Sequence, residues 1–298
     1  MICQHLNNHD ASYSPAKKVK EHYCKGGLTP SLIALFHKII YSYYHRHGRT
    51  FPWRKTYNPY HILISEIMLQ QTSTQRVLEK YDAFITCYPD LSTLSIASLP
   101  DILAHWQGLG YNRRALFLKK IAGIITTDLH GVFPRDEKTL QTLPGIGPYT
   151  AAAICAFAFN QPTILLETNI QSVYIYFFCD GQQKVRDQDL RPLVWQTLDI
   201  RNPRQWYYAL MDYGVMIKKT QDNPSRKSAR YAKQSPFKNS NRQLRGLILR
   251  VLLKEHTVTL HHLCHQVQNS PDHLLPLIIQ LEMEGFIQRD GNTIRLVR

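Results

Sequence analysis

The chain has 298 residues, of which 44% are apolar and 19% are charged, and its formal net charge is +14. This length has room for about two domains, and the apolar content excludes an intrinsically disordered chain. No run of about 18 apolar residues occurs, which excludes a membrane span, and the polar first residues predict no secretory signal. We therefore expect a cytoplasmic protein whose positive charge favours a polyanionic partner, most commonly nucleic acid.

The six cysteines are scattered along the chain, and no CxxC pair occurs. The one local Cys/His cluster, residues 261–265, has no second half at metal-ligand spacing, so we interpret it as a helix surface. No metal site is predicted, and the thiols are expected to be reduced.

Residues 1–27 are polar and weakly patterned, which predicts a flexible arm. From residue 28 onward, apolar residues recur at helical spacing in segments that Gly and Pro turn signals separate. The predicted helices cover residues 30–45, 60–71, 74–87, 113–127, 150–159, 169–178 and 204–218. No convincing strand pair precedes residue 285, so the main body, residues 28–217, is predicted to be all-α.

Residues 218–250 hold ten Lys and Arg residues against one acidic residue, Asp222. Their Ser, Asn and Pro content predicts a loop over 218–240, which is either a solvated linker or a segment that contacts phosphates. Residues 241–298 contain three amphipathic segments and then an Asp-Gly hairpin signal. This pattern predicts a small winged-helix-like α+β domain, a fold that binds either DNA or protein.

Glu66 stands in an apolar predicted helix, on the face shared with Ile62 and Leu69. Burying a carboxylate there is costly, so we expect a raised pKa for Glu66. A carboxyl group that is protonated near neutral pH can act as a general acid. The alternative is a structural glutamate bonded to a backbone N–H group or an arginine, and this motif alone leaves both open.

Residues 106–115 read WQGLGYNRRA and place Tyr111 and Arg113 at a predicted loop-to-helix junction. An exposed tyrosine beside an arginine suits insertion at a DNA base step, although Tyr111 could equally be a core residue.

Residues 143–150 read LPGIGPYT and precede an Ala-rich helix. Gly145 and Gly147 permit a tight turn that exposes backbone N–H groups at a helix N-terminus, which is typical of a phosphate-binding helix–hairpin–helix.

Glu167 follows an apolar run at the start of a predicted helix, 18 residues after Tyr149. Taken alone, this position favours helix capping over catalysis, because a carboxylate complements the N-terminal end of the helix dipole.

In order and spacing, SEIMLQQT (65–72), the GLGY loop and LPGIGPYTAAAI resemble the helix–hairpin–helix DNA glycosylase superfamily, most closely its adenine DNA glycosylase branch. The resemblance covers about residues 30–235. It implies two helical lobes with a base pocket between them, one from residues 30–55 with 160–235 and the other from 56–159. It also implies a monomer that binds double-stranded DNA containing a mispair or damaged base, associated with the nucleoid.

The resemblance assigns roles to individual residues. Glu66 matches the general acid that protonates the purine leaving group, and Glu167 stands at the second carboxylate. Tyr149 and Asn169 match residues beside that carboxylate. The base pocket is matched by Arg49, Trp53, Arg54 and Leu69.

Gln71 and Tyr111 match residues that wedge into the duplex, which a glycosylase needs because its target base must leave the stack. The full predicted DNA-contacting set is Gln70, Gln71, Tyr111, Arg113, Gly145, Gly147, Thr150, Lys218, Arg226 and Lys227. Tyr149 stands where bifunctional relatives carry a Schiff-base lysine, so the resemblance implies a monofunctional glycosylase. Cleaving the glycosidic bond needs an acid on the base and an anion near C1′.

The chain departs from the family pattern at three places. The second carboxylate is normally Asp, and the extra methylene of Glu167 moves it by about 1 Å, which can cost about 10²-fold in rate. The four cysteine ligands of an iron–sulfur cluster are replaced by Lys218, Ser225, Ser228 and Gln234. We therefore expect no such cofactor, although hairpin carbonyls could hold a monovalent cation. The third departure is the small C-terminal domain, which puts recognition of 8-oxoguanine in question.

Three hypotheses about function follow. The leading one is an adenine glycosylase that acts on A opposite G or 8-oxoguanine. The second is a mismatch thymine/uracil glycosylase of the same superfamily. The third is a mismatch- or damage-binding protein that has lost catalysis, which the substitution at Glu167 motivates.

Overall fold

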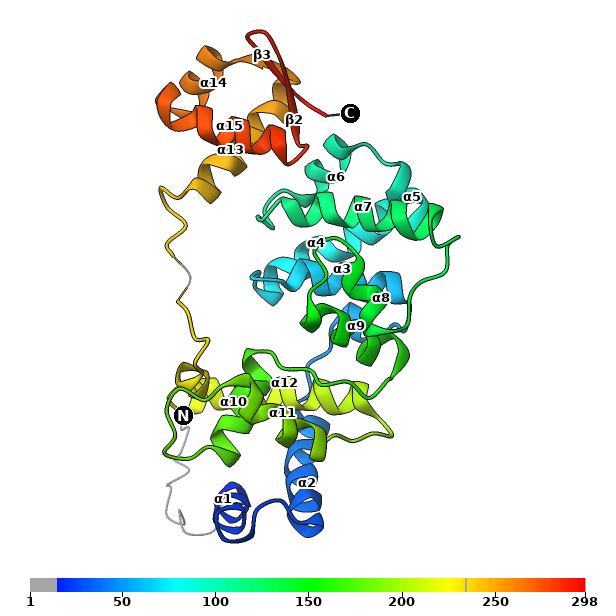
Figure 1. Ribbon diagram of the computed structural model, residues 1–298, viewed down its shortest axis with the longest axis vertical. Coiled ribbons are helices and arrows are strands. Elements are labelled where there is room, and N and C mark those ends of the chain that lie inside the picture. Colours follow the sequence, from blue (N-terminus) through cyan, green and yellow to red (C-terminus); the bar gives the residue numbers. More distant parts are fainter. Residues whose placement is uncertain (1–14, 234, 298) are drawn as a thin grey trace, which may run out of the picture. The chain divides into compact units, whose positions relative to one another are not determined.

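The computed structural model describes residues 15–233 and 235–297, and in these ranges most of the regular structure is helical. A small sheet lies near the C-terminus, so the predicted all-α body with a C-terminal α+β domain is confirmed (Figure 1). The first of two compact units combines the residues up to 50 with 155–232, and the second combines 51–154 with the residues from 233 onward. No helix in the described ranges is both long and apolar enough to cross a bilayer.

The helices of the first unit surround an aromatic core. The ring of Phe36 meets the rings of Phe177 and Phe178 edge-to-face, each at 5.1 Å, and that of Trp206 at 5.6 Å. The elements of this unit are α1 (Pro15–Gly26), α2 (Pro30–His47), α10 (Thr168–Phe178), α11 (Asp187–Gln196), α12 (Pro203–Thr220) and the 3-10 helix η2 (Pro224–Lys227).

Helix α1 occupies part of the arm that the composition of residues 1–27 predicted to be flexible. Val19 of α1 is fully buried, and the ring of Tyr23 meets Phe178 edge-to-face at 5.0 Å. The structure corrects the prediction here, because one narrow apolar stripe is enough to anchor an otherwise charged helix. The remainder of the predicted arm, residues 1–14, lies outside the described residues.

Helices α10 and α12 lie side by side and touch through their backbones at Gly214 (Figure 1). A Cβ atom at Gly214 would stand 2.2 Å from the carbonyl oxygen of Asn169, a distance at which one of the helices must move. Gly214 therefore sets the distance between α12 and the first turn of α10.

We expect Gly214→Ala to lower the free energy of unfolding by about 1–3 kcal/mol, the usual cost of overpacking a tight contact. Gly123→Ala is the matched control, because Gly123 is also helical and a Cβ there meets nothing within 4 Å. The control should gain up to about 1 kcal/mol from helix propensity. Thermal denaturation followed by circular dichroism measures both, and equal stability of the two variants would contradict the assigned contact.

The second unit contains the helical body that carries Glu66 and the hairpin. Its elements before the C-terminal domain are η1 (Pro52–Arg54), α3 (Pro59–Leu69), α4 (Thr74–Cys87), α5 (Leu91–Ile96), α6 (Leu99–Trp106), α7 (Arg113–Thr127) and α8 (Glu137–Thr142). Helix α9 (Pro148–Phe159) begins in this unit and ends in the first. The Asn58 side chain caps α3, accepting hydrogen bonds from the backbone amides of Tyr60 and His61.

The C-terminal domain has three helices and a three-stranded antiparallel sheet in the order β1-β3-β2. The hairpin signal is confirmed, because Asp290 pairs with Thr293 where β2 turns into β3. Strand β1 was not predicted, because in a strand of three residues an alternation of apolar and polar side chains is too short to recognise. The elements are α13 (Asn241–Glu255), β1 (Thr257–Thr259), α14 (Leu260–Val267), α15 (Pro271–Met283), β2 (Ile287–Asp290) and β3 (Thr293–Leu296).

Candidate active site

Glu66 lies in the buried middle of α3, with only 6% of its surface exposed. A carboxyl group so removed from water depends on nearby hydrogen-bond donors for its charge state. Tyr149, at the start of α9, supplies one, because its hydroxyl donates to Glu66 Oε2 over 3.4 Å. The structure thus brings together two of the predicted catalytic residues.

Three of the predicted pocket residues belong to the same unit but differ in their surroundings. Trp53 is packed, 4% exposed, with its ring stacked on Phe51 at 5.0 Å and edge-on to Tyr81 at 5.3 Å. Arg54 is half-buried and holds its guanidinium 5.0 Å from the centre of the Phe51 ring. Leu69 ends α3 and is half-buried. Arg54 and Leu69 therefore retain surface with which to contact a base, whereas Trp53 is buried against Phe51 and Tyr81.

The hairpin between α8 and α9 requires glycine at Gly145. Its φ is +78°, and a Cβ there would lie 2.3 Å from the side chain of Phe117. Gly147 accepts the first hydrogen bond of α9 through its carbonyl oxygen, from the amide of Ala151 at 3.0 Å, and has open space where a side chain would stand. The first amides of a helix have no partner within it, so this turn suits a phosphate oxygen.

Gln70 ties the end of α3 to the hairpin. Its Nε2 donates to Oγ1 of Thr150 over 3.2 Å, and Thr150 is buried. Contact of Thr150 with DNA would therefore fall to its backbone amide. Gln71 is exposed and has a φ of +53°, a left-handed conformation that costs a non-glycine residue free energy.

Tyr111, the second predicted wedge residue, contacts the C-terminal domain. Its hydroxyl accepts a hydrogen bond from Arg242 of α13, whose guanidinium lies 5.3 Å from the centre of the Tyr111 ring. Arg113 lies 3.9 Å from the carboxylate of Glu284, which Arg245 binds at 2.5 Å. The C-terminal domain therefore docks at the loop that was predicted to enter the duplex.

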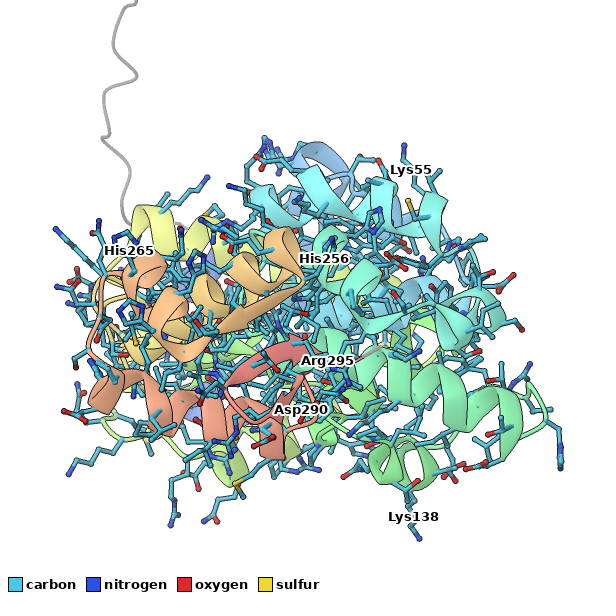
Figure 2. The ribbon with its side chains drawn as sticks, turned by 90° about the horizontal axis from the view of Figure 1, so that it is seen from above. Lys55, Lys138, His256, His265, Asp290 and Arg295 are labelled. Atoms are coloured by element: carbon cyan, nitrogen blue, oxygen red, sulfur yellow. The ribbon has the colours of Figure 1, made fainter. Side chains whose placement is uncertain are left out.

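A cleft of about 500 Å³ lies where the C-terminal domain faces α6. Its lining contains one acidic residue, Asp101, and Arg250 from the basic stretch 218–250. It also contains three residues that were not predicted from the sequence: Lys254, His256 and Arg295 (His256 and Arg295 are labelled in Figure 2). Arg250 and Lys254 lie in the second half of α13, His256 follows that helix, and Arg295 belongs to β3, so only the folded domain brings these residues together.

Glu167 caps the N-terminus of α10, as its place in the sequence favours. Its Oε1 accepts the backbone amides of Asn169 and Ile170 at 2.8 and 2.9 Å. Its Oε2 accepts the side-chain amide of Asn169 at 3.0 Å. The Thr168 hydroxyl also donates to Oε2, over 3.4 Å. The predicted pair of Glu167 and Asn169 is thus in direct contact, and four donors orient the carboxylate.

Lys218 of α12 is a charged neighbour of Glu167. It follows Gly214 by one helical turn, on the face that meets Asn169, and it lines a cavity of about 310 Å³ together with Thr168. Burial raises the pKa of Glu167, while its backbone donors and the charge of Lys218 act in the opposite direction. Burial lowers the pKa of Lys218, and Glu167 opposes that shift. Each side chain therefore stabilises the charged form of the other.

Arg49, a predicted pocket residue of the first unit, is held by Asp212 of α12. Its Nη2 and Nε lie 2.6 and 2.7 Å from Oδ1, and its backbone amide donates to Oδ2 over 2.7 Å. Because Asp212 is buried, this pair fixes the direction of the guanidinium. Asp212 was not predicted from the sequence, where its only signal is a carboxylate within a largely apolar helix.

Arg114 is another buried charged residue that was not predicted from the sequence. It follows Arg113 directly, and nothing in the local pattern distinguishes two adjacent arginines. The fold distinguishes them, because Arg113 is exposed whereas only 6% of the surface of Arg114 is accessible.

Backbone hydrogen bonds and an ion pair hold the basic loop at 221–233. Val185 donates its backbone amide to Lys227 and accepts that of Ala229, both at 2.8 Å, in an isolated parallel bridge. Arg230 binds the carboxylate of Asp187 at 2.8 Å. The loop therefore has its own anchors on the segment that leads into α11.

The donor groups at this loop do not fit an iron–sulfur cluster. Lys218, Ser225 and Ser228 offer an ammonium and two hydroxyls, which cannot replace thiolates, and Ser225 Oγ donates to Asn223 at 2.8 Å. The fourth position, Gln234, lies outside the described residues. Within 15–233 and 235–297, no three His, Cys, Asp or Glu side chains are grouped so that they could hold a metal ion.

Two further predicted DNA contacts, Arg226 and Lys227, belong to η2.

Comparison with known families identifies the central part of the chain. Residues 64–193 match the family described as "HhH-GPD superfamily base excision DNA repair protein". Over these residues the chain is similar to HhH-GPD domains. This match confirms the resemblance drawn from the motifs, and the matched segment includes Glu66, the hairpin and Glu167.

The chain is also similar to curated adenine DNA glycosylases. That of Buchnera aphidicola subsp. Baizongia pistaciae is 38% identical over 188 residues, 61% of this chain and 53% of the relative. That of Mycobacterium tuberculosis strain H37Rv is 41% identical over 135 residues, 45% of this chain and 44% of the relative. The chain spans about half the length of the curated relatives it matches. Among solved structures, a thermostable thymine-DNA glycosylase is 28% identical with a TM-score of 0.56, covering 62% of this chain and 87% of its own.

Proposed function

We propose that this chain is a DNA glycosylase that removes adenine mispaired with guanine or 8-oxoguanine from double-stranded DNA. The observation that carries the proposal is the buried carboxyl of Glu66 with the hydroxyl of Tyr149 beside it, in the same unit as the hairpin. The choice of adenine is supported by the relatives, whose names state that activity. The net charge of +14 suits a DNA partner.

The proposed reaction is hydrolysis at C1′ of the target nucleotide. Protonated Glu66 gives its proton to a ring nitrogen of adenine as the glycosidic bond breaks, and the bonding electrons leave with the base. The carboxylate of Glu167 offsets the positive charge of the oxocarbenium-like sugar. A water oxygen then bonds to C1′ and gives up a proton to a carboxylate, which leaves free adenine and an abasic site.

We propose that the enzyme is monofunctional. Forming a Schiff base with C1′ needs an amine in the site, and Tyr149 offers a hydroxyl that is directed at Glu66 instead. Borohydride should therefore trap no covalent complex with the reacting duplex, and the strand should break only after alkali.

A second candidate is excision of thymine or uracil from mispairs with guanine. It is favoured by the solved thymine-DNA glycosylase, because this chain covers 87% of that protein but only about half of the adenine glycosylases.

A single-turnover assay on end-labelled duplexes tests the proposal. Duplexes with A:8-oxoG, A:G, T:G, U:G or A:T pairs are incubated with excess protein, and abasic sites are then cut with alkali. Cleavage at A opposite G or 8-oxoguanine is expected. Cleavage only at T or U would transfer the activity to the second candidate. Tight binding with no cleavage on any duplex would indicate a binding protein.

A further inference from the structure

Arg114 connects two segments that sequence analysis treated separately. Its Nη1 donates to the carbonyl oxygens of Ile67, Met68 and Gln70 over 2.8, 2.9 and 2.6 Å, where α3 ends. Its Nη2 donates to those of Leu109 and Gly110 over 3.0 and 2.9 Å. One buried guanidinium therefore donates hydrogen bonds to backbone carbonyls of two segments: the end of the helix that carries Glu66 and the loop that precedes Tyr111.

The planar guanidinium is the group that makes this connection. Its nitrogens lie in a rigid fork, so carbonyls on two segments can be bound at a fixed separation, whereas an ammonium would bind them from one point. The group is also packed from the side, with the ring centres of Trp106 and Tyr111 at 5.4 and 5.5 Å from its central carbon. Burial lowers the pKa of Arg114 to about 10, so the group stays charged near neutral pH.

The two residues predicted to wedge into DNA stand at the ends of these segments. Gln71 has a φ of +53° and Tyr111 a φ of +48°, both in the left-handed region that non-glycine residues rarely adopt. Such conformations persist only where the surroundings enforce them. Arg114 supplies that restraint directly, because it binds the carbonyl of Gln70 before one wedge residue and that of Gly110 before the other.

We infer that Arg114 is a positioning residue that holds the backbone at Gln71 and Tyr111 in the left-handed conformations from which both side chains would enter a duplex. The inference rests on the proposed function in one respect, that these residues meet DNA. Without the fork, the chain would still fold around α3 and α7, but the two wedge residues would relax independently.

Arg114→Lys tests the inference, with Lys119→Met as the matched control. Lys119 is a second cation of α7, half-buried where Arg114 is buried, and its Nζ donates to the carbonyls of Ser95 and Ala97 over 3.0 and 2.5 Å, away from the wedge loops. Both variants lose bonds to backbone carbonyls, so both should melt at a lower temperature. Only Arg114→Lys should affect the wedge.

The main readout does not require that any base be excised. Each protein is bound to a duplex that contains a tetrahydrofuran abasic-site analogue flanked by 2-aminopurine, whose fluorescence rises when a wedge unstacks it. The rise should be present in wild type and Lys119→Met and lost in Arg114→Lys, while affinity for intact duplex is unchanged. The excision rate should fall about 10²-fold in Arg114→Lys, as for a displacement of about 1 Å.

Either of two results would overturn the inference: a wild-type fluorescence rise in Arg114→Lys, or an equal loss in Lys119→Met, which would show an effect of stability alone. Failure of wild type to excise adenine would refute the proposed function and leave the fluorescence result standing.

Discussion

Glu66→Gln should slow base excision strongly while DNA binding persists. Glutamine keeps the shape of the side chain and can still accept the hydrogen bond of Tyr149, but it has no proton to give to the leaving base. Because general acid catalysis contributes about 10²–10⁴-fold, the single-turnover rate at saturating protein should fall by about that factor. Electrophoretic mobility shifts with the same duplex measure binding separately.

Glu79→Gln is the control for this change, because it makes the same chemical substitution at an exposed position of the neighbouring helix α4. It should leave the excision rate at the wild-type value. If Glu66→Gln excised its base as fast as this control, Glu66 could not be the acid.

Lys218→Met should move the acidic limb of the rate profile to higher pH. Burial already raises the pKa of Glu167, and Lys218 opposes that rise, so removing the ammonium raises the pKa further. The proposed reaction uses the ionised carboxylate, which is lost as the pH falls through that pKa. The single-turnover rate at saturating protein should therefore begin to fall at a higher pH in the variant than in wild type.

Lys218→Arg retains the charge and should keep the wild-type profile, and Glu167→Gln should lose both the acidic limb and most of the rate. ¹³C NMR titration of the Glu167 carboxyl, assigned with Glu167→Gln, follows the same shift without any reaction. An identical titration in wild type and Lys218→Met would show that the two groups do not interact.

These experiments also bear on the substitution of Glu for Asp at the second carboxylate. In the structure the longer side chain is bound by two backbone amides and the amide of Asn169, and it has Lys218 as a charged neighbour. Our interpretation is that Lys218 compensates for part of the loss in rate that the displaced carboxylate of Glu167 would otherwise cause. In Glu167→Asp the side chain is one methylene shorter, so its carboxylate no longer reaches the same donors. We therefore expect no gain in rate.

The hairpin, the buried Glu66 and the capping position of Glu167 could all be predicted from the sequence. Each depends on local chemistry: glycines at a helix start, a carboxylate on an apolar helix face, and an acidic residue before the first helical turn. The winged-helix-like domain was predictable for the same reason, because its periodicity and its Asp-Gly turn are contained within about 60 residues.

Residues whose role depends on distant partners could only be assigned from the tertiary structure. Arg114 and Arg113 are adjacent in sequence, and only packing makes one a buried connector and the other a surface ion pair. Asp212 binds Arg49, which lies 163 residues earlier in the chain. Lys218 is a charged neighbour of Glu167, on helices that approach closely at Gly214. Periodicity reports which face of an element is buried, whereas the partner of a buried charge is decided by how the elements pack.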